Sequence, residues 1–144
     1  REGIEVCFIC DESGSVISKI VGIEGQVSLP EYDFVHFVLH NHPDGRIFSL
    51  PDIKKAVFSA NVKGIIAIGN NGTLYSFIKR DCYDGFKTWE AVTKYEPIFS
   101  DFVSNGDIDG YVKTMEALME EVKSYGVEFN GRTAGDIKSS DQES

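Results

Sequence analysis

The chain has 144 residues, is 42% hydrophobic and contains ten phenylalanines, so it can fill the core of one domain. Its formal net charge of −9 argues against binding to a nucleic-acid backbone. No apolar run approaches the roughly 20 residues that span a bilayer, and no signal-peptide pattern is present. Because the chain begins with Arg1, we expect it to be part of a longer polypeptide.

The first part of the chain has the alternating pattern of an antiparallel sheet. Residues 4–10 are predicted to form a strand, the Asp-Glu-Ser-Gly run at 11–14 a hairpin turn, and residues 16–21 a second strand. Residues 22–33 are rich in turn formers, with a short strand expected at 26–29.

Three cysteines give an odd number in a chain that is long enough to fold without disulfides. We therefore expect free thiols and a reducing, cytoplasmic compartment. Cys7 and Cys10 lie three apart on the first predicted strand, which places them on opposite faces. They are thus predicted to be core residues rather than ligands of one metal ion.

The next strand, residues 35–42, carries all three histidines of the chain. A strand repeats every two residues, so His40 and His42 share a face and can reach one cation, while Asn41 turns away. Asn41 is expected to support a turn. His36 has the same parity but lies too far along the strand, so we expect it to be packed and hydrogen-bonded.

Ser49 and Asp52 flank the start of a helix predicted over residues 51–60. In that position Ser49 can cap the helix and Asp52 can reciprocate the cap. The turn after the histidine strand could also bring Asp52 back to His40 and His42. Two histidines and one carboxylate form a ligand set that leaves a tetrahedral zinc ion an open position for water.

The middle of the chain returns to strand patterns. Residues 64–69 form a short apolar run that we predict to be a strand buried on both faces. Asn-Asn-Gly at 70–72 predicts a hairpin turn, and residues 73–79 predict the returning strand. Together with the first half, this pattern predicts a mixed sheet in an α/β fold.

The C-terminal part has helical periodicity. Residues 82–126 are predicted to form helices, with the first one broken or kinked at Pro97 and the second covering residues 108–125 up to Gly126. Residues 129–144 are rich in Gly, Ser, Asp and Lys and are predicted to be a disordered tail.

The run His40-Asn41-His42-Pro43-Asp44-Gly45, followed by Phe48-Ser49-Leu50-Pro51-Asp52, resembles the motif of the JAMM (MPN-type) metallopeptidases. It is most similar to the RadC-like branch and to JAB domains attached to phage and toxin proteins. The resemblance covers residues 2–80. It implies a single domain over residues 1–128, with a mixed sheet flanked by helices in the layered fold that JAMM proteins share with cytidine deaminases.

The resemblance also implies a role for each site residue. His40, His42 and Asp52 would bind zinc, and Glu5 would accept a proton from the zinc-bound water and pass it to the leaving amine. Ser49 would hydrogen-bond the developing oxyanion. The implied activity is zinc-dependent hydrolysis of a peptide or isopeptide bond in a protein or peptide substrate. Glu2 is the alternative base, but Glu5 is preferred because it lies inside the strand.

Two other interpretations stay open from the sequence. His42 and Asp52 are ten positions apart, where the family usually has eleven, so the chain could be a non-catalytic JAMM-like interaction module in a phage-derived or toxin-associated polypeptide. A structural zinc site made of Cys7, Cys10, His40 and His42 is the second. The oligomeric state is not predicted.

Overall fold

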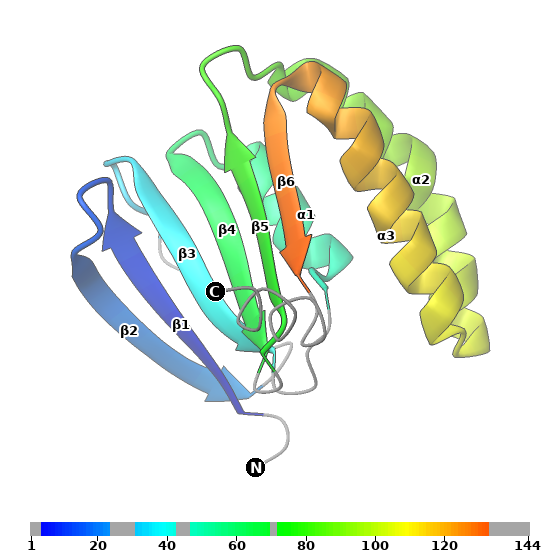
Figure 1. Cartoon of the computed structure of the whole chain (residues 1–144), viewed down its shortest axis with the longest axis horizontal. Helices are drawn as coiled ribbons and strands as arrows, with labels where there is room; N and C mark the ends of the chain where they lie inside the picture. The colour runs from blue at the N-terminus through cyan, green and yellow to red at the C-terminus, as the bar shows by residue number, and fades with distance from the viewer. Residues whose placement is uncertain (1–3, 24–30, 43–46, 70–71, 133–144) are drawn as a thin grey trace, which may run out of the picture.

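The computed structural model describes residues 4–23, 31–42, 47–69 and 72–132, and its centre is a mixed sheet of six strands in the order β2-β1-β3-β4-β5-β6 (Figure 1). The predicted mixed α/β architecture is therefore confirmed. Glu2, the strand expected at 26–29 and Pro43 lie outside the described residues. The elements are β1 (Ile4–Asp11), β2 (Val16–Ile23), β3 (His36–His42), α1 (Leu50–Phe58), β4 (Val62–Gly69), β5 (Leu74–Lys79), α2 (Gly85–Asn105), α3 (Ile108–Val122), a 3₁₀ turn (Lys123–Tyr125) and β6 (Val127–Arg132).

The sheet combines antiparallel hairpins with one parallel crossover. β1 pairs antiparallel with both β2 and β3, and β5 pairs antiparallel with β4 and β6. β3 and β4 are parallel, and α1 forms the connection between them. This crossover brings the chain back from the end of β3 at His42 to the start of α1, which is the arrangement that the sequence motif requires.

The helices pack on one face of the sheet, and the core lies between the two layers (Figure 1). Alternate strand residues such as Ile9, Val38, Ile65 and Phe77 point into this core and are buried. The prediction that β4 is buried on both faces is wrong, because Ile68 points to the opposite face and is 42% exposed. Among the described helices, none has the length and apolarity needed to cross a membrane.

Pro97 does not end the helix, so of the predicted break or kink, the break is wrong. It lies inside α2, which runs without interruption from Gly85 to Asn105. A proline removes the hydrogen bond to the carbonyl four residues earlier, here that of Thr93. Both Pro97 and Thr93 are exposed, so water can solvate the freed carbonyl and the helix continues.

The disordered tail was predicted to begin at residue 129, which is too early. Asn130 and Gly131 belong to β6, where they pair with Ser76 and Tyr75 of β5. The backbone hydrogen bonds of an edge strand order these polar residues, although their composition is typical of a loop. Residues 133–144 lie outside the described part of the chain.

Lys79 is an unusual core residue, because it places an amine on the helix-covered face of the sheet while only 7% exposed. Its Nζ donates to the Ser59 carbonyl at the end of α1, at 3.0 Å, and lies 5.1 Å from the centre of the Tyr83 ring. Burial, with a smaller contribution from the charge of Lys63, lowers the pKa of Lys79 from 10.5 to about 8. The charged form is thus disfavoured in the folded state.

We predict that Lys79→Met stabilises the fold at neutral pH by about 2–3 kcal/mol, because it removes the cost of burying a charge. The Ser59 carbonyl keeps a partner, since it also accepts from the Val62 N–H at 3.0 Å. Between the folded pKa of about 8 and the unfolded value of 10.5, the unfolded chain binds the extra proton. Stability of the unmodified protein should therefore rise with pH in that window, and the advantage of the variant should disappear.

Urea unfolding of both proteins from pH 7 to pH 10.5 measures this difference. Lys113→Met, at an exposed position of α3, is the control and should change stability little at any pH. A constant difference between Lys79→Met and the unmodified protein across the window would contradict the explanation.

Candidate functional site

His40 and His42 lie on the core face at the end of β3 and are each 5% exposed. The two-residue repeat of the strand brings the rings together, with their centres 4.8 Å apart and their planes at 74°. His42 is the last residue of β3, so both rings lie at the C-terminal end of this strand, near the start of α1. The predicted shared face of the two histidines is confirmed.

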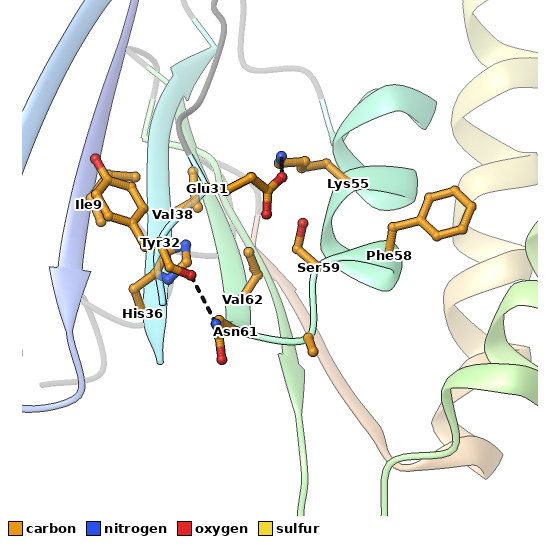
Figure 2. Close-up of a pocket in the computed structure, with 11 residues that line it drawn as sticks. Ile9, Glu31, Tyr32, His36, Val38, Lys55, Phe58, Ser59, Asn61 and Val62 are labelled. Atoms are coloured by element: carbon orange, nitrogen blue, oxygen red, sulfur yellow. Dashed lines mark hydrogen bonds and ion pairs between the residues drawn. The ribbon is translucent and has the colours of Figure 1, made fainter. Parts of the chain in front are cut away.

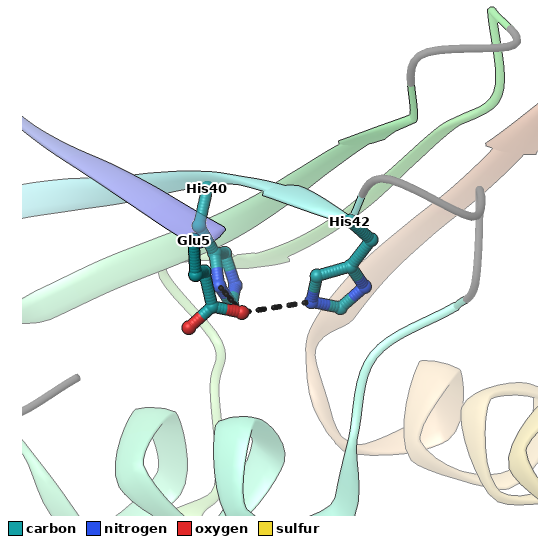
Figure 3. A group of neighbouring side chains, drawn as sticks. All are labelled: Glu5, His40 and His42. Atoms are coloured by element: carbon teal, nitrogen blue, oxygen red, sulfur yellow. Dashed lines mark ion pairs between the residues drawn. The ribbon is translucent and has the colours of Figure 1, made fainter. Parts of the chain in front are cut away.

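Glu5 approaches the rings from the neighbouring strand (Figure 3). Cys7 of β1 is opposite His40, so Glu5, two residues earlier on the same face, extends toward His42. Its Oε2 atom lies 3.7 Å from His40 Nδ1 and 3.8 Å from His42 Nε2, and the residue is 9% exposed. This group of one carboxylate and two imidazoles could hold a metal ion.

Asp52 approaches the same rings from α1. Its Oδ2 atom lies 3.7 Å from His40 Nε2 and 3.5 Å from His42 Nε2. The same side chain completes a capping box: the Ser49 N–H donates to Asp52 Oδ2 at 3.0 Å, and the Asp52 N–H donates to Ser49 Oγ at 3.2 Å. The two predicted roles of Asp52 are therefore compatible, because the helix start that it caps lies beside the histidines.

The charge of Asp52 is favoured in this environment. Burial opposes its ionisation, but contact with the His42 ring, the charge of His40 and the Ser49 N–H outweigh that cost and hold the pKa of Asp52 below its usual 3.8. The carboxylate is thus present at neutral pH, in the form that a cation requires.

The separations between the carboxylate oxygens and the ring nitrogens can also accommodate a shared cation. Separations of 3.5–3.8 Å are longer than normal N–H···O hydrogen bonds. Ligands bound to zinc at 2.0–2.2 Å in a tetrahedron are about 3.4 Å apart. In addition, the buried His40 Nε2 has no hydrogen-bond partner among the described residues, which is costly unless another group binds there. The donor set therefore fits a small divalent ion.

Ser49 lies next to this cluster through the capping box. Its oxygen accepts the Asp52 N–H, an interaction that leaves its own hydroxyl proton for another acceptor. The interpretation of Ser49 as only a cap and its interpretation as a hydrogen-bond donor to a ligand are both compatible with this geometry.

Cys7 and Cys10 are core residues, as predicted, whereas Cys82 is exposed. Cys7 and Cys10 are buried, and all three thiols are free. Burial, reinforced by the charges of Glu5 and Asp52, raises the pKa of the Cys7 thiol to about 12. The metal-capable group found among the described residues contains neither Cys7 nor Cys10, so the structural zinc site built on these cysteines is not supported.

His36 is packed and hydrogen-bonded, as predicted, since its Nδ1 lies 2.9 Å from the Phe34 carbonyl oxygen. It lines a cavity of about 230 Å³ at the opposite end of β3, between the sheet and the end of α1 (Figure 2). The Lys55–Glu31 ion pair closes part of this cavity. None of the four clustered site residues lines it, so it is separate from the candidate site.

The role expected for Asn41 is wrong. Instead of supporting a turn, its side-chain oxygen accepts a hydrogen bond from the Val6 N–H of β1 at 2.6 Å. Sequence reasoning missed this contact because the two residues are 35 positions apart, and no local pattern marks a side chain that bonds to a neighbouring strand.

Comparison with known proteins gives no match: no family model, no curated protein and no solved structure is similar to this chain. The geometry of the cluster is therefore the basis for assigning a function.

We predict that Asp52→Asn weakens zinc binding about 100-fold or more, because loss of an outer partner of a ligand already costs 10–100-fold. The fold should change little, since the amide oxygen of the substituted side chain can still accept the Ser49 N–H. Ser49→Ala should do the opposite: it removes the cap and costs about 1 kcal/mol of stability, with zinc affinity nearly unchanged.

Chelator competition measures the zinc affinity, and urea unfolding in EDTA measures the stability of the metal-free protein. Asp107→Ala is the matched control, because Asp107 caps α3 by accepting the Gly110 N–H at 2.9 Å. It should lose stability as Ser49→Ala does, with unchanged zinc binding. Equal zinc affinity in Asp52→Asn and the unmodified protein would show that Asp52 is only a cap.

Proposed function

We propose that the chain is a zinc-dependent hydrolase that cuts a peptide or isopeptide bond. The observation that carries the proposal is the convergence of Glu5, His40, His42 and Asp52 at one buried spot, with separations of 3.5–3.8 Å between their polar atoms. Further support comes from the buried His40 Nε2, for which the described part of the chain offers no hydrogen-bond partner. The proposal includes the JAMM-like layered fold, supported by the order of β1, β3 and α1 in the chain.

His40, His42 and Asp52 are the proposed ligands. The metal-capable group among the described residues is Glu5, His40 and His42, without Asp52. Asp52 Oδ2 nevertheless lies 3.7 Å from His40 Nε2 and 3.5 Å from His42 Nε2, on the side where both rings can offer the same nitrogen. Glu5 instead lies on the Nδ1 side of His40. Since one imidazole cannot direct both nitrogens to the same ion, this geometry favours Asp52 as ligand and leaves Glu5 for another role. A zinc ion bound there would act as a Lewis acid and make an attacking water acidic near neutral pH.

Glu5 is the proposed proton carrier. Its carboxylate is 3.8 Å from His42 Nε2, close enough for a water molecule between the ligand set and the carboxylate to be in hydrogen-bond reach. Glu5 would accept the proton of that water and later deliver it to the nitrogen of the departing amine. The same residue on the Nδ1 side of His40 would favour the tautomer whose Nε2 lone pair faces the ion.

Ser49 is the proposed oxyanion donor. It precedes the first turn of α1, where backbone N–H groups and the helix dipole favour negative charge. A hydroxyl held there by the Asp52 N–H can donate to the oxygen that becomes negative when water adds to an amide carbonyl. Hydrolysis of an amide, with a protein or peptide as the substrate, uses all of these groups.

A second candidate is a non-catalytic interaction module with a structural ion. The observation in its favour is that Glu5 also lies within ligand distance of both rings. If Glu5 and Asp52 both bind, the four ligands close the tetrahedron and no position remains for water. The two candidates differ in whether Glu5 holds the ion or works beside it.

We predict that Glu5→Gln retains zinc within about threefold and lowers hydrolysis about 100- to 10,000-fold, the usual contribution of a general base. Zinc content is measured by elemental analysis after dialysis. Hydrolysis is measured on a fluorogenic peptide library and on lysine-linked isopeptide conjugates. Glu128→Gln, at an exposed position of β6, is the control and should match the unmodified protein.

Loss of zinc in Glu5→Gln to the extent seen in Asp52→Asn would favour the closed structural site. Purified protein that takes up no zinc with all four residues intact would contradict both candidates. Iron in place of zinc would redirect the proposal, because two histidines and one carboxylate also bind Fe(II) in oxygenases.

A further inference from the structure

β1 and β3 separate from each other just before they reach the candidate site. Their described pairing runs from Asp11 opposite His36 to Cys7 opposite His40 and stops there. Both strands continue, however, because β1 extends back to Ile4 beside β2, and β3 extends to His42 beside β4. The two site residues beyond the last pair, Glu5 and His42, therefore lie on strand ends that no longer share a regular ladder.

One side chain bridges this gap. Asn41 Oδ1 accepts the Val6 N–H at 2.6 Å, in the place where a backbone carbonyl of β3 would otherwise be expected. Val6 adjoins Glu5 in the chain, and Asn41 lies between the two histidines. Beyond the last described pair, Cys7 opposite His40, this hydrogen bond joins the strand end that carries the carboxylate to the strand end that carries His42.

We propose that Asn41 is a positioning residue that sets the distance between the Glu5 carboxylate and the two imidazoles. This inference rests on the proposed function. Apart from this bond, the sheet partner of the β1 end among the described residues is β2, an edge strand, through pairs such as Glu5 opposite Gly22. A proton carrier must be held within about 0.5 Å of its working place, and an error of about 1 Å can cost 100-fold in rate.

The side chain of Asn41 can hold the Glu5 end of β1 in a way that continued backbone pairing between β1 and β3 could not. Continued backbone pairing would keep Glu5 and His42 at the spacing of directly opposite residues, about 5 Å between Cα atoms. The separated strands leave room for an ion and a water between the side chains, and the amide oxygen still fixes the strand end. Asn41 acts through Glu5 and is not itself a catalytic residue.

Asn41→Leu tests the proposal, because leucine has nearly the same shape but offers no acceptor. We expect the Val6 amide to exchange with solvent about tenfold faster or more, as measured by NMR. The NOEs between the Glu5 γ-protons and the ring protons of His40 and His42 should weaken. In hydrolysis, kcat should fall about tenfold or more with KM nearly unchanged, and zinc affinity should stay within about threefold.

Asn41→Asp is the conservative variant, since it keeps an oxygen at the same place. It should preserve the protection of the Val6 amide and the NOEs. Phe37→Leu, on the same face of β3 but within the paired region opposite Cys10, is the control and should leave all four measurements unchanged.

Unchanged Val6 exchange in Asn41→Leu would overturn the proposal, because the hydrogen bond would not hold the strand end. Faster Val6 exchange with unchanged NOEs would also overturn it, since Glu5 would then be positioned by other contacts. The NOEs need neither metal nor substrate. If the unmodified protein hydrolyses nothing, the proposed function fails, while the NOEs still decide whether Asn41 positions Glu5.

Discussion

Two carboxylates that face two imidazoles at one buried spot impose the strongest electrostatic constraint on this molecule. The side chains of Glu5 and Asp52 are only 12% and 21% exposed. Like charges repel more strongly in a partly buried site than in water: two unit charges 4 Å apart interact by about 4 kcal/mol in a protein-like environment and about 1 kcal/mol in water. A divalent cation bound between the carboxylates would offset this repulsion. The chain as a whole carries a net charge of −9, which adds to the preference for a cation.

The fold brings these charges together from three elements that are distant in sequence. β1 supplies Glu5, β3 supplies the histidines, and α1 supplies Asp52. The parallel pairing of β3 and β4 forces a crossover, so α1 must begin at the edge of the sheet where β3 ends. Ligands of α/β sheets bind at this carboxyl edge. The site is therefore a consequence of topology, and the positive end of α1 is oriented toward it by the same crossover.

The sequence predicts the parts of the site that depend on local periodicity. Strand parity placed His40 and His42 on one face, and helix-start chemistry placed Ser49 and Asp52 at the first turn of α1. It could not decide between a capping and a ligand role for Asp52, because that question depends on how closely α1 packs beside β3. The structure removes the conflict: one oxygen accepts the Ser49 N–H and also faces both rings.

Tertiary contacts explain each feature that was predicted wrongly or missed from the sequence. Pro97 is tolerated in α2 because the carbonyl that it frees faces solvent, and Asn130 is ordered because β5 offers it a ladder. Ile68 is exposed because the described helices cover the other face of the sheet. The bond from Val6 to Asn41 joins residues that no short pattern connects. In each case a partner or a solvent boundary far along the chain decides the outcome.

The distance between the Glu5 carboxylate and the bound ion distinguishes an enzyme from a structural metal site. The two histidines take part in either arrangement, and Asp52 faces the Nε2 atoms of both. What remains is the position of Glu5: an oxygen about 2 Å from the ion closes its coordination, whereas one about 2 Å further away leaves room for water. The β1–β3 ladder does not fix that position, because it ends at Cys7 opposite His40, and Glu5 pairs with Gly22 of β2 on the other side. The Asn41 side chain is the element that fixes it, so the chemistry of the site depends on a residue that binds neither ion nor substrate.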